Sequence, residues 1–305
     1  MQTFKRVIVG LDFTETDDKV VSYTSFFSKI LKFKKIYFVH VHNHLDIPEE
    51  VRQEIYGTDT PLDEILEDEM KRNVKAHFEN YKDFNIEYKV LDGPTFSQIL
   101  NFSKIKEANL VILGRKETAG SGMLLTRMSR RARASILIVP ENAQLYLDSI
   151  SVCMDFSKNS EVALEYAIDI SKAADYTNVY CHHVYTVPTG YHASGKSLPE
   201  FAQIMKKQAA SKFDEFIANV DEKGVRVAPV YTFDKKHGSA KLVTDAAASM
   251  QSELILVGSK GRTYAASIFL GSFAEKLIRQ KSNIPLLVIK RKGETLGIID
   301  AIKNM

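Results

Sequence analysis

The residues best suited to hold a ligand form a glycine-rich stretch near the end of the chain. The apolar run Leu254–Val257 is followed by Gly258-Ser259-Lys260-Gly261, and after nine more residues Gly271-Ser272 begin a segment with helical periodicity. Glycine lets a backbone turn sharply and approach a ligand closely. The start of a helix offers N–H groups and the positive end of a dipole, both of which attract an anion. The pattern therefore predicts a loop that cradles a phosphate chain.

Two cations inside this stretch, Lys260 and Arg262, are candidates to neutralise the phosphates. Two plainer interpretations stay open, because glycines also punctuate ordinary strand-to-helix turns and loop cations are commonly just solvated. The order of strand, loop and helix favours the phosphate-binding interpretation, since it places the loop at the carboxyl edge of a predicted sheet.

The chain repeats itself at a nearly constant offset. Asp12 and Asp155 follow matching apolar runs 143 residues apart, and His40 and His183 are separated by the same interval. The run that ends at Gly258 has its counterpart 144 residues earlier. A period this long indicates duplicated whole domains and not a solenoid. We expect two domains, residues 1–145 and 146–305, joined by a segment too short to be a flexible tether.

Within each copy, short apolar runs alternate with longer segments of helical periodicity. Continuous Val, Ile and Leu runs are typical of parallel strands covered on both faces. Each copy is therefore predicted to be an α/β domain with a doubly wound, five-stranded parallel sheet of Rossmann-like type. The later expected strands are 86–91, 110–113 and 136–139 in the first copy, and 225–232, 254–257 and 286–289 in the second. Ligands bind such sheets at the carboxyl ends of the strands.

The motif Gly258-x-x-Gly261, nine residues, then Gly271-Ser272 resembles the nucleotide-binding motif of the universal stress proteins, and Asp155 and His183-Val184 fit the same family. The whole chain resembles a tandem universal stress protein over residues 3 to 291. In ATP-binding members, the first-strand aspartate and nearby backbone hold the adenosine, and the valine that ends the second strand lines the adenine pocket. The glycine loop and the Gly-Ser pair hold the phosphates.

Carried over to this chain, the resemblance implies ATP, with Mg²⁺, in the second copy. It implicates Cys153, Met154, Asp155, Val184, Val257, Gly258, Gly261, Gly271, Ser272 and Phe273 as ligand-binding residues. The family often has proline where Cys153 stands, a departure that changes packing more than charge.

The first copy departs from the motif. Glu117 stands where the second glycine is expected, Arg127-Met128 replace Gly-Ser, and Gly120-Ser121 mark a shortened helix start. A carboxylate repels phosphates, so we expect only the second copy to bind ATP in the family manner. The basic residues left over are either a solvated helix face or a site for another anion or partner. They are Arg115, Lys116, Arg127, Arg130, Arg131 and Arg133.

Three other features carry competing interpretations. His40, His42 and His44 alternate and could supply a zinc site, but His40 has a counterpart in His183, which favours a structural role. Cys153 and Cys181 are expected to be buried, inert thiols, and the competing interpretation is a redox sensor. Residues 186–198 are rich in turn formers and could close over a nucleotide as a lid or form a linker without ligand contact.

Composition narrows the function classes. The 305 residues are 45% hydrophobic and carry a net charge of +3, too mild to argue for nucleic acid or an anionic membrane. No apolar run is long enough to span a bilayer, and the chain runs straight into a strand, so neither an anchor nor a signal peptide is expected. Two cysteines fit a reducing compartment, and we expect a cytoplasmic protein.

No catalytic triad, paired-carboxylate pattern or metal-binding motif is evident, so no catalytic or metal-ligating residues are assigned. The leading hypothesis is a nucleotide-dependent regulatory protein of the stress response, with weak ATP hydrolysis or autophosphorylation at most. There are two alternatives: a slow adenine-nucleotide hydrolase, and a carrier of another small ligand in the first domain. We expect the two domains to pair as an intramolecular pseudo-dimer through the strands 136–139 and 286–289, and a homodimer of chains stays open.

Overall fold

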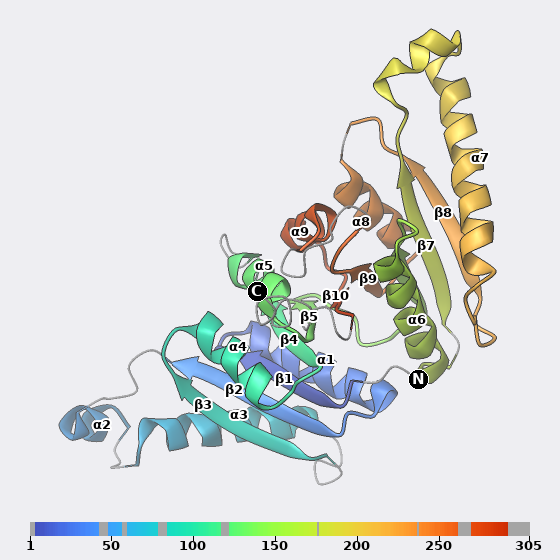
Figure 1. The fold of residues 1–305 in the computed structure, drawn as a ribbon. Coiled ribbons are helices and arrows are strands. Elements are labelled where there is room, and N and C mark those ends of the chain that lie inside the picture. The colour runs from blue at the N-terminus through green and yellow to red at the C-terminus, as the bar shows by residue number, and fades with distance from the viewer. Residues whose placement is uncertain are drawn as a thin grey trace, which may run out of the picture. The chain divides into compact units, whose positions relative to one another are not determined.

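The computed structural model describes residues 4–42, 48–56, 60–78, 84–116, 122–175, 177–236, 238–261 and 270–291. The chain divides into two compact units, and the boundary lies between Leu145 and Tyr146. Each unit is a parallel α/β sheet with helices on both faces (Figure 1), which confirms the predicted fold class.

The first unit holds five described strands in the order β3-β2-β1-β4-β5, all parallel. Helices α1 and α3 pack together on one side, and α4 and α5 pack against each other. The order along the chain is β1 (Arg6–Leu11), α1 (Thr16–Leu31), β2 (Lys35–His42), α2 (Glu49–Tyr56), α3 (Leu62–His77), β3 (Ile86–Asp92), α4 (Thr95–Ile105), β4 (Leu110–Arg115), α5 (Gly122–Arg131) and β5 (Ser135–Pro140).

The second unit repeats this plan with the strand order β10-β9-β6-β7-β8, again all parallel. Helix α6 packs on β6 and β9, and the long helix α7 lies along β7 and β8 (Figure 1). The elements are β6 (Ser149–Cys153), α6 (Lys158–Ala173), β7 (Asn178–Tyr185), the 3₁₀ helix η2 (Thr189–Ser194), α7 (Leu198–Ile217), β8 (Val227–Phe233), α8 (Ser239–Ser249), β9 (Leu254–Gly258), α9 (Ser272–Arg279) and β10 (Leu286–Ile289).

Strand β8 starts later than the sequence pattern predicts. It begins at Val227 and not at Val225, because the Val225 amide donates to the Glu222 carbonyl and so belongs to the preceding turn. Four strands behave as predicted: the residues of β5, β6, β9 and β10 are all buried, which explains their continuous apolar runs.

The start of the first strand is held in the same way in both units. In the first unit, the Asn109 side-chain oxygen accepts the N–H groups of Lys5 and Arg6 at 2.7 and 2.8 Å. In the second unit, a carboxylate oxygen of Glu253 accepts the N–H groups of Asp148 and Ser149 at 3.0 and 2.9 Å. Each side chain precedes the fourth strand of its unit, so it ties the two neighbouring strands together at their amino ends.

Close backbone packing requires glycine where each fourth strand passes the first helix. A Cβ atom on Gly258 would lie 2.8 Å from the Asn159 carbonyl oxygen, and one on Gly114 would lie 2.7 Å from Cγ2 of Thr16. Both distances are shorter than real Cβ contacts. The carboxyl end of the strand can therefore approach the start of the helix only without a side chain.

Gly258→Ala is expected to lower the free energy of unfolding by about 1–3 kcal/mol, because the added methyl group meets rigid backbone at Asn159. Gly190→Ala is the matched control, since a Cβ on Gly190 meets nothing within 4 Å and should leave stability nearly unchanged. Chemical denaturation of both variants checks this. Equal stability of the two would show that the strand and helix can separate without penalty.

Candidate functional site

A pocket of about 470 Å³ opens at the carboxyl edge of the second unit, where β6, β7 and β9 end. It has the size typical of small-molecule sites. Every ligand residue expected from the sequence lines it except Arg262, which lies outside the described residues. These residues are Cys153, Met154, Asp155, Val184, Val257, Gly258, Lys260, Gly261, Gly271, Ser272 and Phe273.

The glycine motif brings two parts of the backbone together at the pocket. The Gly271 N–H donates to the Ser259 carbonyl at 2.8 Å, and the Ser259 N–H donates to the Ile289 carbonyl at 2.9 Å. A Cβ on Gly271 would lie 3.4 Å from Cα of Lys260. A Cβ on Gly261 would lie 2.9 Å from the Asp155 carboxylate. The motif therefore presents main chain, and not side chains, beside Asp155.

Groups that attract an anion lie on the β9 side of the pocket. Helix α9 begins at Ser272, and the first N–H groups of a helix have no partner within the helix. Lys260 and Lys276 also line the pocket. Within the part of the chain that the structure describes, Lys260 makes no ion pair. These groups together suit an anion at the β9 side of the site.

A turn with the same geometry fixes the first strand to the first helix in both units. In the second unit, Nδ1 of His183 donates to the Met154 carbonyl at 2.8 Å, and its ring lies 4.6 Å from that of Phe156. In the first unit, Nδ1 of His40 donates to the Leu11 carbonyl at 3.0 Å. The corresponding phenylalanine of each turn has a positive φ, near +60°. Both histidines thus hold a turn in place.

The same hydrogen bond concerns the possible zinc site at His40, His42 and His44. His40 uses its Nδ1 within the turn, and burial lowers the pKa of its imidazole. No group of three metal-ligating side chains is present among the residues the structure describes. His44, the third member of the sequence pattern, lies outside those residues.

The two cysteines lie on neighbouring strands but face opposite sides of the sheet. Cys153 pairs in register with His182, whereas Cys181 pairs with Val152. Register partners share a face and successive residues alternate, so the two thiols point apart. Both are buried, and burial raises the pKa of each thiol. The geometry agrees with the interpretation of inert, structural thiols.

Several pocket residues were not anticipated from the sequence. Among them, Asp234 follows β8 and accepts the N–H groups of Lys236 and Gly238, which leads the chain into α8. Ser239 begins that helix. Of the turn-rich residues 186–198, Thr186 lines the pocket, residues 189–194 form η2, and α7 begins at Leu198. The other lining residues outside the predicted ligand set are Ser160, His182, His183, Ala274 and Lys276.

His182 is the least expected of these residues. Its side chain is 2% exposed, and its Nε2 lies 3.0 Å from the Ser151 hydroxyl. That hydroxyl lies 2.7 Å from Ser252, so a line of polar groups runs beneath the pocket. Burial lowers the pKa of His182 to about 4, and the imidazole is therefore neutral at physiological pH.

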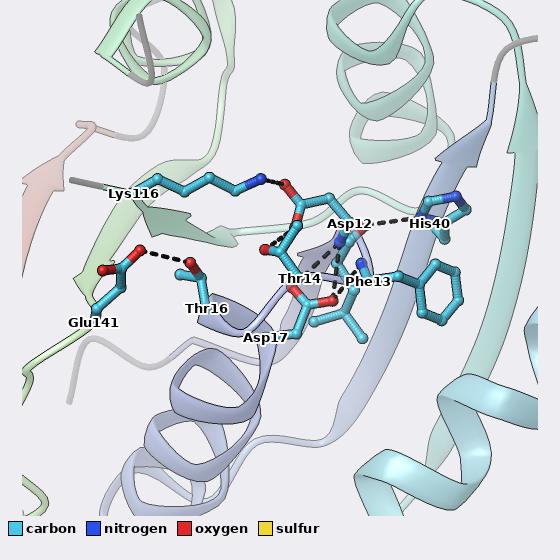
Figure 2. Close-up of polar contacts among 9 residues, drawn as sticks. Asp12, Phe13, Thr14, Thr16, Asp17, His40, Lys116 and Glu141 are labelled. Carbon is cyan, nitrogen blue, oxygen red and sulfur yellow. Dashed lines mark hydrogen bonds and ion pairs between the residues drawn. The ribbon is translucent and has the colours of Figure 1, made fainter. Parts of the chain in front are cut away.

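The first unit has a pocket of about 600 Å³ at the matching edge of its own sheet, but its lining differs. The Lys116 ammonium, which corresponds in the repeat to Lys260, forms an ion pair with Asp12 at 2.5 Å (Figure 2). Arg127 also lines the pocket, and its guanidinium lies 4.0 Å from the ring centre of Phe96.

The six basic residues that the sequence groups together therefore differ in burial and in position. Arg115 is buried, and burial lowers its pKa to about 10, whereas Arg130, Arg131 and Arg133 are exposed. Lys116 and Arg127 line the pocket.

A buried carboxylate distinguishes the first pocket further. Asp17 stands where the second unit has Ser160, and its carboxylate accepts the N–H groups of Asp12 and Phe13 at 3.0 and 2.7 Å (Figure 2). Its side chain is 5% exposed. Burial raises the pKa of Asp17 to about 6, and the nearby Asp12 charge adds to the rise. This pocket therefore holds negative charge at its base.

The raised pKa predicts a pH dependence. Because folding raises this pKa from 3.8, Asp17 contributes stability that is fully present below pH 4 and is lost as the pH rises through 6. The size is at most about 3 kcal/mol. Asp17→Ser, which copies Ser160, should remove this part of the pH dependence.

Denaturation of the wild-type chain and the variant between pH 4.5 and 7.5, together with a carbon-detected titration of Asp17, tests this. A carboxyl midpoint near 4, or the same pH dependence in both proteins, would contradict it.

No described helix is long and apolar enough to cross a membrane.

Comparison with known proteins identifies the family. The model of the universal stress protein family matches residues 3–139 and again residues 147–290. Universal stress protein MJ0577 of Methanocaldococcus jannaschii is 26% identical over 154 residues, which cover 46% of this chain and 92% of the relative. Universal stress protein MJ0531 of the same organism is 28% identical over 156 residues, which cover 50% of this chain and 88% of the relative.

The crystal structure of a universal stress protein from Archaeoglobus fulgidus superposes with a TM-score of 0.61 at 19% identity, over 94% of this chain and 98% of that one. That likeness concerns the fold. The two family matches cover most of the sequence, one in each unit, and they confirm the resemblance expected from the motif. The chain belongs to the universal stress protein family and carries two of its domains in tandem.

Proposed function

We propose that this chain is an ATP-binding regulatory protein, and that the pocket of the second unit holds the nucleotide. The observation that carries the proposal is the main-chain cradle at Gly261 and Gly271, where a side chain would fill the space beside Asp155 or Lys260. Bare main chain, a helix start and an ammonium group at one side of a 470 Å³ pocket suit a phosphate chain.

The donor set fits a nucleotide whose Mg²⁺ is carried mainly by its phosphates. The described lining of the second pocket includes two carboxylates, Asp155 and Asp234. One oxygen of Asp155 accepts the Ser157 N–H, and one oxygen of Asp234 accepts two N–H groups. Mg²⁺ commonly keeps several waters and takes one or two carboxylates with substrate phosphates. Asp155 is the candidate for such a contact.

A regulatory role suits this site better than rapid catalysis. A nucleotide hydrolase needs a group that orients the attacking water, in addition to charge neutralisation at the phosphates. In the second unit, each imidazole at the pocket has one ring nitrogen in a hydrogen bond with the protein, and the thiol of Cys153 is buried and protonated. Occupancy of the pocket is then the signal, with slow hydrolysis or autophosphorylation as a secondary property.

The alternative, a slow adenine-nucleotide hydrolase, makes a separate prediction. Turnover with Mg²⁺ well above background, abolished by Asp155→Ala while ATP still binds, would support it.

A pocket of about 600 Å³ in the first unit favours a second function, the carriage of a different small ligand. The Asp12–Lys116 ion pair and the buried Asp17 carboxylate replace the glycine cradle. A polyphosphate would have to displace Asp12 from Lys116 and lie near Asp17, which like-charge repulsion opposes. Mass spectrometry of small molecules released from the purified chain would identify such a ligand.

Calorimetric titration with Mg·ATP is expected to give one nucleotide per chain. Lys260→Met should weaken binding about tenfold or more, because a charge-assisted hydrogen bond to phosphate is lost. Lys116→Met is the matched control in the first unit and should leave the affinity unchanged, since Lys116 is paired with Asp12.

Two nucleotides per chain at saturation would contradict the assignment to one unit. Equal weakening by the two substitutions would contradict it as well, and absence of binding at millimolar ATP would overturn the proposed function.

A further inference from the structure

Asp234 brings a carboxylate to the second pocket on the side away from the glycine motif. The residue lines the pocket and is only 5% exposed. Its Oδ1 accepts the N–H groups of Lys236 and Gly238 at 3.0 and 3.1 Å. Its Oδ2 accepts no hydrogen bond from the residues that the structure describes. One of the two carboxylate oxygens is therefore left to accept a hydrogen bond from another molecule.

The unused oxygen has access to the pocket. Oδ2 of Asp234 is not among the described side-chain atoms that lack both a partner and accessible surface. It therefore keeps accessible surface, although the residue as a whole is nearly buried. Because Asp234 lines the pocket, this surface faces the space that a ligand fills. A buried carboxylate is stabilised when each oxygen meets a donor, so the site favours a ligand that donates a hydrogen bond here.

The fold does not require a carboxylate at this position. The first unit has Gly93 in the equivalent place: the Gly93 N–H donates to the His42 carbonyl, as the Asp234 N–H donates to the Tyr185 carbonyl. His42 and Tyr185 are 143 residues apart, and each pairs with the last residue of the neighbouring strand.

The turn that follows differs in length between the units. In the first unit, α4 begins two residues after Gly93 without a side-chain cap. In the second unit, α8 begins five residues after Asp234, and Oδ1 stabilises this longer turn through its two N–H contacts. Oδ2 contributes nothing to the turn, so it is the atom whose presence the fold leaves unexplained.

The strand order shows which end of a nucleotide this oxygen can meet. The glycine motif follows β9 and Asp234 follows β8, and β6 and β7 lie between these two strands. Neighbouring strands lie about 4.8 Å apart, so the two features are separated by about 14 Å across the sheet. A nucleotide carries its base and its phosphates at opposite ends of the ribose. Phosphates at the glycine motif therefore direct the base toward β8.

We propose that Asp234 is a specificity-determining residue of this site, and that its Oδ2 accepts a hydrogen bond from the 6-amino group of adenine. That amino group carries the only N–H donors of the adenine base. The inference rests on the proposed function, since it assumes ATP in the second pocket. Main chain at the phosphates does not distinguish one base from another, whereas a carboxylate accepts from an amino group and repels the carbonyl oxygen that guanine has in its place.

The test is a calorimetric cycle between a protein variant and a ligand analogue. Asp234→Asn keeps one oxygen for the two N–H groups and replaces Oδ2 with an amide NH₂, which cannot accept a hydrogen bond. It should weaken Mg·ATP binding about tenfold, because a hydrogen bond to a charged acceptor is lost. Purine riboside triphosphate lacks only the 6-amino group. It should bind the wild-type chain about tenfold more weakly than ATP, and this deficit should disappear in the variant.

Asp221→Asn is the matched control. Asp221 accepts the Lys223 N–H at 3.0 Å in a similar turn, but it is exposed and lies outside the described lining of the pocket. This variant should bind ATP and the analogue as the wild-type chain does. The unfolding temperatures of both variants, measured without ligand, should stay close to that of the wild type.

The outcomes separate this inference from the proposed function. If the wild-type chain does not bind ATP, both are overturned. If ATP binds the wild-type chain and Asp234→Asn equally, or if the analogue deficit persists in the variant, the role of Asp234 is overturned and ATP binding stands. Tighter binding of GTP than of ATP, or a deficit of 2′-deoxy-ATP that disappears in the variant, would also overturn the assignment to the adenine amino group.

A measurement on the wild-type chain covers the case in which the variant does not fold. The carbon-13 signal of the Asp234 carboxyl should shift on saturation with ATP, and less on saturation with purine riboside triphosphate. Equal shifts with the two ligands, or equal affinities of the wild-type chain for them, would overturn the inference.

Discussion

Both pockets depend on one hydrogen bond, from a histidine of the second strand to the carbonyl group at the end of the first. His183 makes it to Met154 and His40 makes it to Leu11. The bond holds a turn in which a phenylalanine takes a left-handed conformation, which is unfavourable for a residue with a bulky side chain. The aromatic contact between that ring and the histidine stabilises the turn further. With the turn fixed, Asp155 or Asp12 is set at the carboxyl edge of its sheet.

The second shared constraint is the close passage of the fourth strand past the first helix. Gly258 and Gly114 permit it, and in both units the strand ends beside the aspartate turn. Both constraints recur in the two units, and each unit has a pocket at this edge of its sheet. The chemistry of each pocket is then decided by substitutions that leave the scaffold unchanged.

The two units differ in the residues that line their pockets. Ser160 in one pocket corresponds to Asp17 in the other, and His182 corresponds to Val39. Lys260 makes no ion pair among the described residues, whereas its counterpart Lys116 is neutralised by Asp12. The second pocket therefore presents positive charge and main-chain donors, and the first presents a carboxylate base with an internal ion pair. Duplication of a scaffold followed by a change of lining accounts for two pockets whose charged groups are paired and placed differently.

The sequence by itself determined the duplication, the parallel sheets and the glycine motif, because these depend on local periodicity and on residue types at fixed spacing. The resemblance to the universal stress proteins, which the motif carries, also indicated Asp155 and Val184. Sequence comparison of the two copies could have drawn attention to His182, which stands against Val39. Only the tertiary structure showed that the His182 imidazole is buried with one nitrogen unpaired, that Lys116 is paired with Asp12, and that Asp234 reaches the same pocket from β8. These facts depend on which distant segments the sheet brings together, and on the burial and charge around each group, neither of which is encoded in local spacing.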